Sequence, residues 1–389
     1  MIQSNHLDVV LKISKHCNLR CTYCYEYEEL ADRSRMSLDQ IGRVFDTLRR
    51  YTDVNDSITS IRFAWQGGEP MLIKPEVYRA IGDRCEAAFA GTRVAVSHVV
   101  QTNLTALSAA WLTFLREGRF FSDVGISFDV VGDCRVDVKG QLRTATVLTN
   151  LQALIDARVP FAAIAVISRP SLPGIAHVHG FFDELGIETR FLPFNQSVSD
   201  RQFQDHAVHP HEIADAFKGL FDRWMASDLA TSMEPVREYL GYALNVLRGV
   251  RWPGVGSDLD QLESVFIVHT NGNTWGMADL YVPDACYGNL FEEEFSDILG
   301  SPSRRRASDR LRARVSTVCG ACPYFGACPG FGVAFAMPDE RAALALHGCV
   351  VRTMIDHILD RLGQTESPDA LGRTGARDGH GNPAIATSL

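Results

Sequence analysis

Apolar residues follow two alternating patterns along the first half of the chain. Short runs rich in Val, Ile and Phe predict strands, and stretches with apolar residues every three or four positions predict helices. The predicted strands are Val9–Ser14, Ser60–Trp65, Val94–Val100, Val124–Phe128, Phe161–Ser168 and Thr189–Phe194. Helices are expected after Ser37, from Pro75, and over Leu107–Glu117, Ala145–Ala157 and Val178–Leu185. This alternation predicts a parallel α/β fold with right-handed crossovers, and the pattern alone leaves a partial barrel and a doubly wound sheet open.

The alternation ends after Asn195. Two helical stretches follow, His211–Met225 and Pro235–Arg248, and then a hairpin that turns at Asn271-Gly272. A cysteine-rich region leads into a helix predicted over Pro338–Leu362. The sequence from Gln364 onward has no periodicity, which predicts a disordered tail. The expected organisation is an α/β domain over 1–200, a helical connector over 201–262, a small cysteine-rich domain over 263–362 and a tail over 363–389.

Composition narrows the function. The chain has 389 residues and a net charge of −9, which argues against nucleic acid as the main partner. The sequence shows neither an apolar run long enough to span a membrane nor a signal peptide, so we expect a cytoplasmic protein without a membrane partner. Ten cysteines in such a chain favour metal binding over disulfides.

Three of these cysteines follow the first predicted strand in a C-x3-C-x2-C pattern: Cys17, Cys21 and Cys24. Thiolates select zinc, copper(I) or iron–sulfur centres. A zinc site usually draws four ligands from two separated pairs, and a structural zinc knuckle is the simpler alternative here. A compact trio instead suits a [4Fe–4S] cube with one iron open to a further ligand.

A second motif, Gly67-Gly68-Glu69-Pro70, follows the second predicted strand. Two glycines permit a ligand to approach the backbone closely, although Gly-Gly is also a common turn. The carboxylate beside them can accept hydrogen bonds from an amino group.

Together the two motifs resemble the radical S-adenosylmethionine (AdoMet) enzymes, over roughly residues 8 to 195. The resemblance implies a partial (β/α)6 TIM-like barrel with a [4Fe–4S] cluster at its mouth, where AdoMet chelates the open iron. Reductive cleavage of AdoMet would then yield a 5′-deoxyadenosyl radical that abstracts a hydrogen atom from the substrate.

The resemblance also implies which residues contact AdoMet. The expected set is Tyr23, Gly67, Gly68, Glu69, Asn103, Ser127, Arg143 and Leu192. Tyr23 resembles an aromatic residue near the adenine, and the Gly-Gly-Glu motif resembles the one that holds the methionine amino group. Ser127 resembles a polar residue that contacts the ribose or carboxylate, and Arg143 an arginine that pairs with the carboxylate. A turn-forming asparagine and a solvated arginine are the alternatives for Asn103 and Arg143.

One local departure from the family pattern follows Ser127. Asp129 stands in a segment that in many relatives reads Ser-Leu-Asp-Gly, and here Val130 replaces the glycine. We therefore expect the turn after this strand to differ locally.

A second cysteine set lies near the C-terminus: Cys319, Cys322, Cys328 and Cys349. Four thiolates suit a [4Fe–4S] cluster or a tetrahedral zinc ion. The spacing resembles the SPASM extension of radical AdoMet peptide-modifying enzymes, which implies an auxiliary [4Fe–4S] cluster. A full extension carries seven cysteines and two auxiliary clusters, but Gly332 and Met277 stand near two of the expected positions. We expect one auxiliary cluster and leave Cys286 unassigned.

The resemblance implies a maturase of ribosomally made peptides. A cyclophane-forming enzyme is the first interpretation: a Cβ hydrogen is abstracted, and the carbon radical adds to an aromatic ring. Thioether-forming maturases and anaerobic sulfatase maturases, which make formylglycine, are alternatives, and a non-catalytic zinc-binding regulatory protein is a remote one. The sequence assigns no catalytic base.

The expected partners follow from this interpretation. They are a precursor peptide and an external electron donor of the flavodoxin or ferredoxin type. Because only about eight residues precede the first predicted strand, we expect a leader peptide to be recognised by the enzyme itself or by a separate protein.

Overall fold

Parallel strands and helices alternate through the first half of the molecule. The computed structural model describes residues 4–194, 203–228, 231–251, 263–277, 280, 282–334 and 348–364. The strands are β1 (His6–Lys12), β2 (Ser60–Gln66), β3 (Ala95–Thr102), β4 (Asp123–Ser127), β5 (Ala162–Ile167) and β6 (Thr189–Pro193). The helices are α1 (Leu38–Val54), α2 (Pro75–Phe89), α3 (Ala109–Glu117), α4 (Thr144–Asp156) and α5 (Ile175–Glu184). The first strand begins before the predicted Val9, because His6 and Leu7 already pair with β2.

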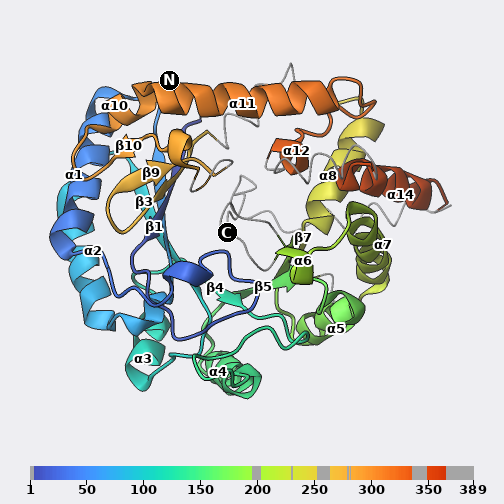
Figure 1. Cartoon of the computed structure of the whole chain (residues 1–389), viewed down its shortest axis with the longest axis horizontal. Coiled ribbons are helices and arrows are strands. Elements are labelled where there is room, and N and C mark those ends of the chain that lie inside the picture. Colours follow the sequence, from blue (N-terminus) through green and yellow to red (C-terminus); the bar gives the residue numbers. More distant parts are fainter. Residues whose placement is uncertain are drawn as a thin grey trace.

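The strand order identifies the architecture. The sheet runs β10-β9-β8-β1-β2-β3-β4-β5-β6-β7, and β1 to β6 each lie parallel to their neighbour in sequence. A doubly wound sheet would reverse its order at a switch point, whereas this order advances steadily, as in a barrel. Figure 1 shows the helices that follow these strands on the outside. The architecture is therefore the predicted partial barrel.

Further strands and helices follow, and the strands extend the sheet at both ends. They are α6 (Phe203–His206), α7 (Pro210–Ala226), β7 (Met233–Glu234), α8 (Val236–Leu247), β8 (Val265–Val268), β9 (Asn273–Trp275), β10 (Gly288–Asn289), α10 (Phe295–Gly300), α11 (Pro302–Cys319), α12 (Phe331–Ala334) and α14 (Val350–Gln364). Strand β8 pairs in parallel with β1 as well as forming the predicted hairpin with β9. The sheet is thus continuous across the domain boundary expected at residue 263, and that division stays a prediction.

Helix α11 was not predicted from the sequence. The helix contains six arginines, which mask its apolar periodicity in the sequence. Its buried residues form a narrow stripe: Arg304, Ala307, Leu311, Val315 and Cys319. Figure 1 shows α11 running from the α10 side of the molecule to α12. The helix predicted over Pro338–Leu362 is wrong at residues 348–349, because Gly348 has φ of 83° and helix α14 begins only at Val350; residues 338–347 lie outside the described residues. Helix α14 extends to Gln364, into the start of the predicted tail, and the rest of the tail lies outside the described residues. The described helices include none that is long and apolar enough to cross a membrane.

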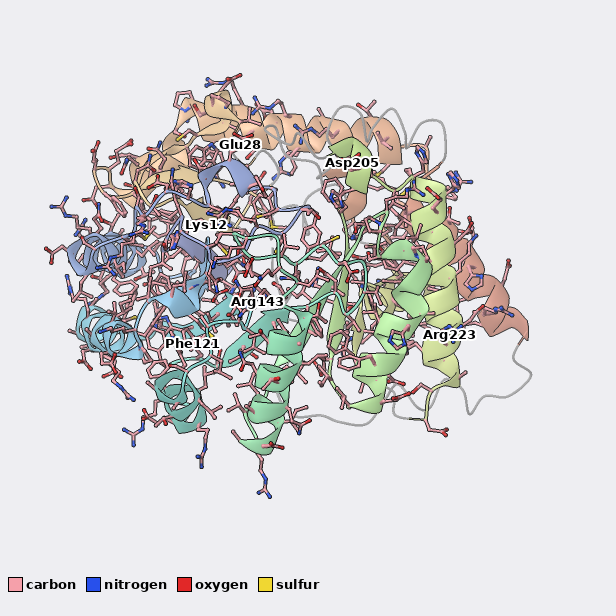
Figure 2. The ribbon with its side chains drawn as sticks, turned by 60° about the horizontal axis from the view of Figure 1, so that its bottom comes forward. Lys12, Glu28, Phe121, Arg143, Asp205 and Arg223 are labelled. Carbon is pink, nitrogen blue, oxygen red and sulfur yellow. The ribbon has the colours of Figure 1, made fainter. Side chains whose placement is uncertain are left out.

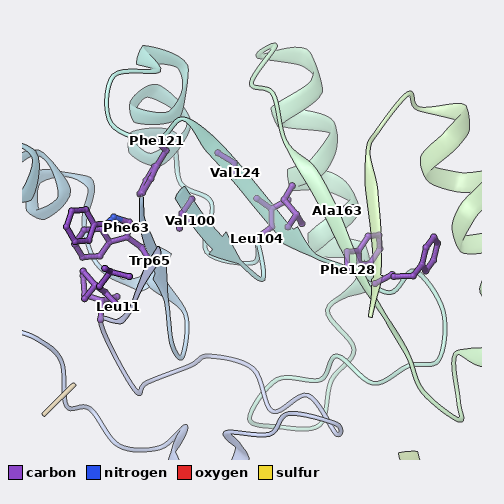
Figure 3. Packing of buried hydrophobic residues seen from close by; sticks show 14 of the residues in the cluster. Leu11, Phe63, Trp65, Val100, Leu104, Phe121, Val124, Phe128 and Ala163 are labelled. Atoms are coloured by element: carbon purple, nitrogen blue, oxygen red, sulfur yellow. The ribbon is translucent and has the colours of Figure 1, made fainter. Parts of the chain in front are cut away.

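The main hydrophobic core lies between the sheet and the outer helices. Phe63 and Trp65 of β2 pack there with Val100 of β3, as Figure 3 shows. Alternate residues of a strand face opposite sides, so Val10 and Ala64 pack in a second, smaller cluster. Each fully buried large side chain contributes roughly 1.5–3 kcal/mol of hydrophobic stabilisation. With the strands fixed on both faces, the loops at their C-terminal ends have defined starting points.

Candidate active site

The loop that carries the first cysteine trio begins where β1 ends. The Arg20 guanidinium donates to the carbonyl oxygens of Cys17 at 2.8 Å, Leu19 at 2.6 Å and Leu30 at 3.2 Å.

The second half of the loop is fixed by backbone hydrogen bonds to the segment after β4. Arg20 N donates to Val136 O at 2.7 Å, and Thr22 N donates to Cys134 O at 2.9 Å. The segment after β4 therefore holds the loop from one side.

Lys12, the last residue of β1, holds the end of the loop. Its Nζ donates to Tyr25 Oη at 2.7 Å and lies 3.0 Å from Glu26 Oε1 (Figure 2 labels Lys12). Burial alone lowers the pKa of Lys12, but Glu26 and Tyr25 outweigh burial, and the pKa lies above its usual value. A charged lysine thus fixes the two residues directly after Cys24.

The three thiols of the trio lie close enough to influence one another. Burial raises the pKa of Cys17 to about 12, and Glu69 and Cys21 add to the shift. Burial also raises the pKa of Cys24, with further contributions from Glu26, Cys21 and Cys17. Among the described residues, no three His, Cys, Asp or Glu side chains converge on a single ion position. In a [4Fe–4S] cube each thiolate binds its own iron, so this group does not require three side chains to meet at one ion position.

Hydrogen-bond donors point at the sulfurs of this loop. Leu19 N lies 3.4 Å from Cys17 Sγ, and Asn103 Nδ2 donates to the same sulfur at 3.6 Å. An Nη1 atom of Arg135 lies 4.0 Å from Cys21 Sγ. Donors stabilise the charged thiolate, which is the form that binds iron. This arrangement fits the group that the sequence predicts.

The two glycines of the second motif bring two loops together. Gly67 and Gly68 have φ of 89° and 48°, and a Cβ at Gly68 would lie 2.2 Å from the carbonyl oxygen of His16. A Cβ at Gly67 would lie 2.8 Å from Ser14 O. The close approach seen in the structure is therefore to the backbone of the cysteine loop, and the expected contact with a ligand stays a prediction.

Glu69 fixes the same region from inside. Its carboxylate is 1% exposed and accepts hydrogen bonds from Met71 N at 2.9 Å, Thr102 Oγ1 at 2.6 Å and Asn103 N at 2.7 Å. Burial raises the pKa of Glu69, and these three bonds oppose the shift. Glu69 ties the ends of β2 and β3 together, while its expected role toward the methionine amino group stays a prediction.

Asn103 is bonded on both sides of its side chain. Its Nδ2 also donates to Asn18 Oδ1 at 3.1 Å, and its Oδ1 accepts from the Thr105 backbone and hydroxyl at 2.9 and 2.6 Å. A turn-forming asparagine is thus one part of its role. Its contact with Cys17 places the same side chain beside the predicted cluster.

Tyr23 belongs to a buried network. Its hydroxyl donates to Asp129 Oδ2 at 2.5 Å, and Arg135 Nε donates to the same oxygen at 3.0 Å. The Arg135 guanidinium lies 5.7 Å from the centre of the Tyr23 ring. Val130 adopts φ of 64°, a conformation that suits the glycine it replaces and is strained for a β-branched residue. Val130 thus adopts a backbone conformation that glycine favours, and the expected local difference from the relatives' turn stays a prediction.

The three remaining predicted contacts lie on other elements. Ser127 ends β4 and accepts a hydrogen bond from Gln101 Nε2 at 2.7 Å. Arg143 stands at the N-terminal end of α4, as labelled in Figure 2, and its guanidinium lies 3.7 Å from Asp137 Oδ2. Leu192 is a half-buried residue of β6. Their contacts with AdoMet stay predictions.

The second cysteine set lies at the end of α11, in the loop that follows it and directly before α14. Burial raises the pKa of Cys319 to about 12, and Cys349 and Cys322 add to the shift. Burial also raises the pKa of Cys328 to about 12, with contributions from Cys349, Cys319 and Cys322. Gly330 has φ of 85°, and a Cβ there would lie 3.2 Å from Cys319 Sγ. The fold therefore gathers the four cysteines that the sequence grouped.

The chain is similar in sequence to a known protein family and to several of its relatives. The model of the Radical SAM superfamily matches residues 11–170. The chain carries a radical SAM domain. It is 25% identical over 296 residues to the cysteine-type anaerobic sulfatase-maturating enzyme of Clostridium novyi, covering 74% of this chain and 77% of the relative. The serine-type enzyme of Klebsiella aerogenes is 28% identical over 48% of this chain and 46% of its own length.

Solved structures share the radical SAM domain's fold. Native anSMEcpe with bound AdoMet aligns with a TM-score of 0.72 at 19% identity, over 92% of this chain and 98% of its own. Streptococcus suis SuiB bound to S-adenosylmethionine aligns with a TM-score of 0.57 at 14% identity, over 83% and 72%. These likenesses confirm the predicted fold class.

The protein is thus a radical SAM enzyme, and a [4Fe–4S] cluster and AdoMet are its cofactors. Cys17, Cys21 and Cys24 are the residues that would hold the cluster. Sequence reasoning missed Arg135, which is buried against Tyr23 and Cys21. It stands in a polar loop without periodicity, so no sequence signal separates it from a surface arginine.

Proposed function

We propose that the protein is a radical SAM maturase that oxidises a side chain of a peptide or protein. The similarity to sulfatase-maturating enzymes over three-quarters of the chain carries this proposal. Those relatives act on sulfatases by name, so formylglycine formation from a Cys or Ser side chain is the favoured reaction. This order reverses the sequence-based preference for a cyclophane-forming enzyme.

The chain's own residues supply the frame for this chemistry. When bound, the cofactors supply the 5′-deoxyadenosyl radical that abstracts a hydrogen atom. The loop braced by Lys12 and Arg20 holds the three thiols, and Glu69 and Asn103 fix the neighbouring strand ends beside Cys17. The second cysteine set is the site proposed for an auxiliary [4Fe–4S] cluster that accepts the substrate electron.

A cross-linking peptide maturase is the second candidate. Anaerobic sulfatase maturases resemble full SPASM proteins with two auxiliary clusters, whereas this chain has Gly332 and Met277 near two expected cysteine positions. An enzyme with a single auxiliary cluster would differ from these maturases in this respect, which favours a cross-linking reaction over formylglycine formation. The cyclophane and thioether products both belong to this candidate.

One assay separates the candidates. In the first arm, the anaerobically reconstituted enzyme is incubated with AdoMet, a reductant and a sulfatase-type Cys or Ser peptide. In the second arm, the gene for the enzyme is co-expressed with a precursor-peptide gene from its genomic neighbourhood. Formylglycine formation gives an aldehyde that a hydrazide captures, whereas cross-linking removes two hydrogen atoms and leaves no aldehyde. Absence of 5′-deoxyadenosine together with two tightly bound zinc ions would refute both and support the regulatory alternative.

A further inference from the structure

We propose that Arg135 is a positioning residue for the radical SAM cluster, whose charge beside the Cys21 sulfur raises the cluster's reduction potential. The inference rests on the trio Cys17, Cys21 and Cys24 holding that cluster. It assigns a role to a residue that the sequence motifs leave out.

Arg135 is held in one orientation. Its side chain is 8% exposed, and its Nε donates to Asp129 Oδ2 at 3.0 Å. The other oxygen of Asp129 accepts a hydrogen bond from Val166 N in β5 at 2.8 Å, so the carboxylate is anchored to the sheet. Tyr23 caps the pair, with its ring 5.7 Å from the guanidinium. This frame directs Nη1 to within 4.0 Å of Cys21 Sγ.

The backbone around Arg135 is joined to the same loop. Val136 O and the carbonyl of residue 134 accept hydrogen bonds from Arg20 N and Thr22 N, on either side of Cys21. Because these bonds flank the cysteine, the backbones at Cys21 and Arg135 cannot move far apart without breaking both. The contact is therefore built into the fold on the backbone and on the side chain.

A fixed positive charge beside a cluster sulfur has a defined effect. Reduction adds negative charge to the cluster, and the guanidinium stabilises that charge more strongly in a buried site than water would. Net charge and hydrogen bonds to the sulfurs are the quantities that set the potential of such clusters. Asp129 acts in the opposite sense, since its carboxylate is buried in the same network.

Opposite shifts are the signature of this role. Arg135→Gln removes the positive charge and should lower the midpoint potential of the cluster. Asp129→Asn removes the negative charge and should raise it. A merely structural role would loosen the loop in both variants and would not give shifts of opposite sign.

Two further variants complete the experiment. Arg62→Gln is the matched control, because it makes the same charge change at a largely buried arginine that pairs with Asp8 at 2.6 Å, near the start of β1 and away from the cysteine loop. It should leave the potential of the cluster unchanged. The double variant Asp129→Asn/Arg135→Gln buries no unpaired charge, so it remains testable if Arg135→Gln does not fold, and its potential should lie below that of the wild type.

The measurement is a redox titration followed by EPR on the full, reconstituted chain. The change in the EPR spectrum on adding AdoMet identifies the radical SAM cluster, and iron content confirms loading. Unchanged potentials, or shifts of one sign in both single variants, would overturn the proposal. If iron binds and AdoMet is cleaved in that case, the proposed function stands; if the trio binds no iron in the wild type, both fail.

Discussion

Single residues decide how the two loops of the site meet. Gly68 is the sharpest example, because its backbone is left-handed and a Cβ would lie 2.2 Å from a backbone oxygen that cannot rotate away. Val130 shows the reverse, since the fold imposes a glycine-like φ on a β-branched residue. At both positions the loop geometry fixes the backbone, and the side chain must fit it.

Gly68→Ala should disrupt the cysteine loop. The added methyl forces Gly68 away from His16, and we expect a loss of about 3 kcal/mol in the free energy of unfolding together with reduced iron content. Gly91→Ala is the matched control, because φ there is 71° but nothing lies within 4 Å of a Cβ. The control should lose only about 1 kcal/mol and keep its iron. Equal losses in denaturant unfolding of the two variants would contradict the steric argument.

At the scale of elements, β3 carries a buried ionisable group in the core. The ring of His98 stacks on Phe120 with centroids 4.3 Å apart, and its Nδ1 accepts a hydrogen bond from Trp65 Nε1 at 3.2 Å. Burial lowers the pKa of His98 to about 4 from its usual value near 6.5. Above pH 6.5 the ring is neutral in the folded and unfolded chains, so it adds no pH dependence there.

Below pH 6.5 this ring should destabilise the fold. The unfolded chain takes up a proton that the folded chain binds only near pH 4, so stability falls by on the order of 3 kcal/mol across this window. In His98→Asn the amide oxygen can replace Nδ1 as the acceptor, so this variant should be less stable at neutral pH but lose less on acidification. Denaturant unfolding of both proteins between pH 7 and 4 tests this, since acid loss of the clusters is common to both. Parallel pH curves would count against it.

At the scale of the whole molecule, two cysteine sites are built from separate elements. The first depends on the ends of β1 to β4, and the second on α11 and α14. Strand β8 pairs with β1 and precedes the second set in the chain. The two predicted sites therefore use different cysteines and different elements.

Cys322→Ser should separate the two sites. We expect roughly half of the bound iron to be lost, because a four-thiolate site loses one ligand, while reductive cleavage of AdoMet continues at the first site. Cys286→Ser is the control: its thiol donates to Gly288 O at 3.7 Å, and we expect the variant to retain its iron. Iron analysis and 5′-deoxyadenosine assays check both. Loss of AdoMet cleavage in Cys322→Ser would show that the sites depend on each other.

The strand–helix alternation and the two cysteine sets could be predicted from the sequence, because periodicity and short spacing are local properties of the chain. The sequence also indicated that Gly67 and Gly68 permit a close approach to the backbone, and it predicted that a ligand makes this approach. The packing of Gly67 and Gly68 on the cysteine loop became evident only in the tertiary structure, and so did the position of Arg135 against Cys21, since the sequence made no prediction for Arg135. Such contacts depend on how the loops after different strands cross, and that path is set by the packed sheet beneath them.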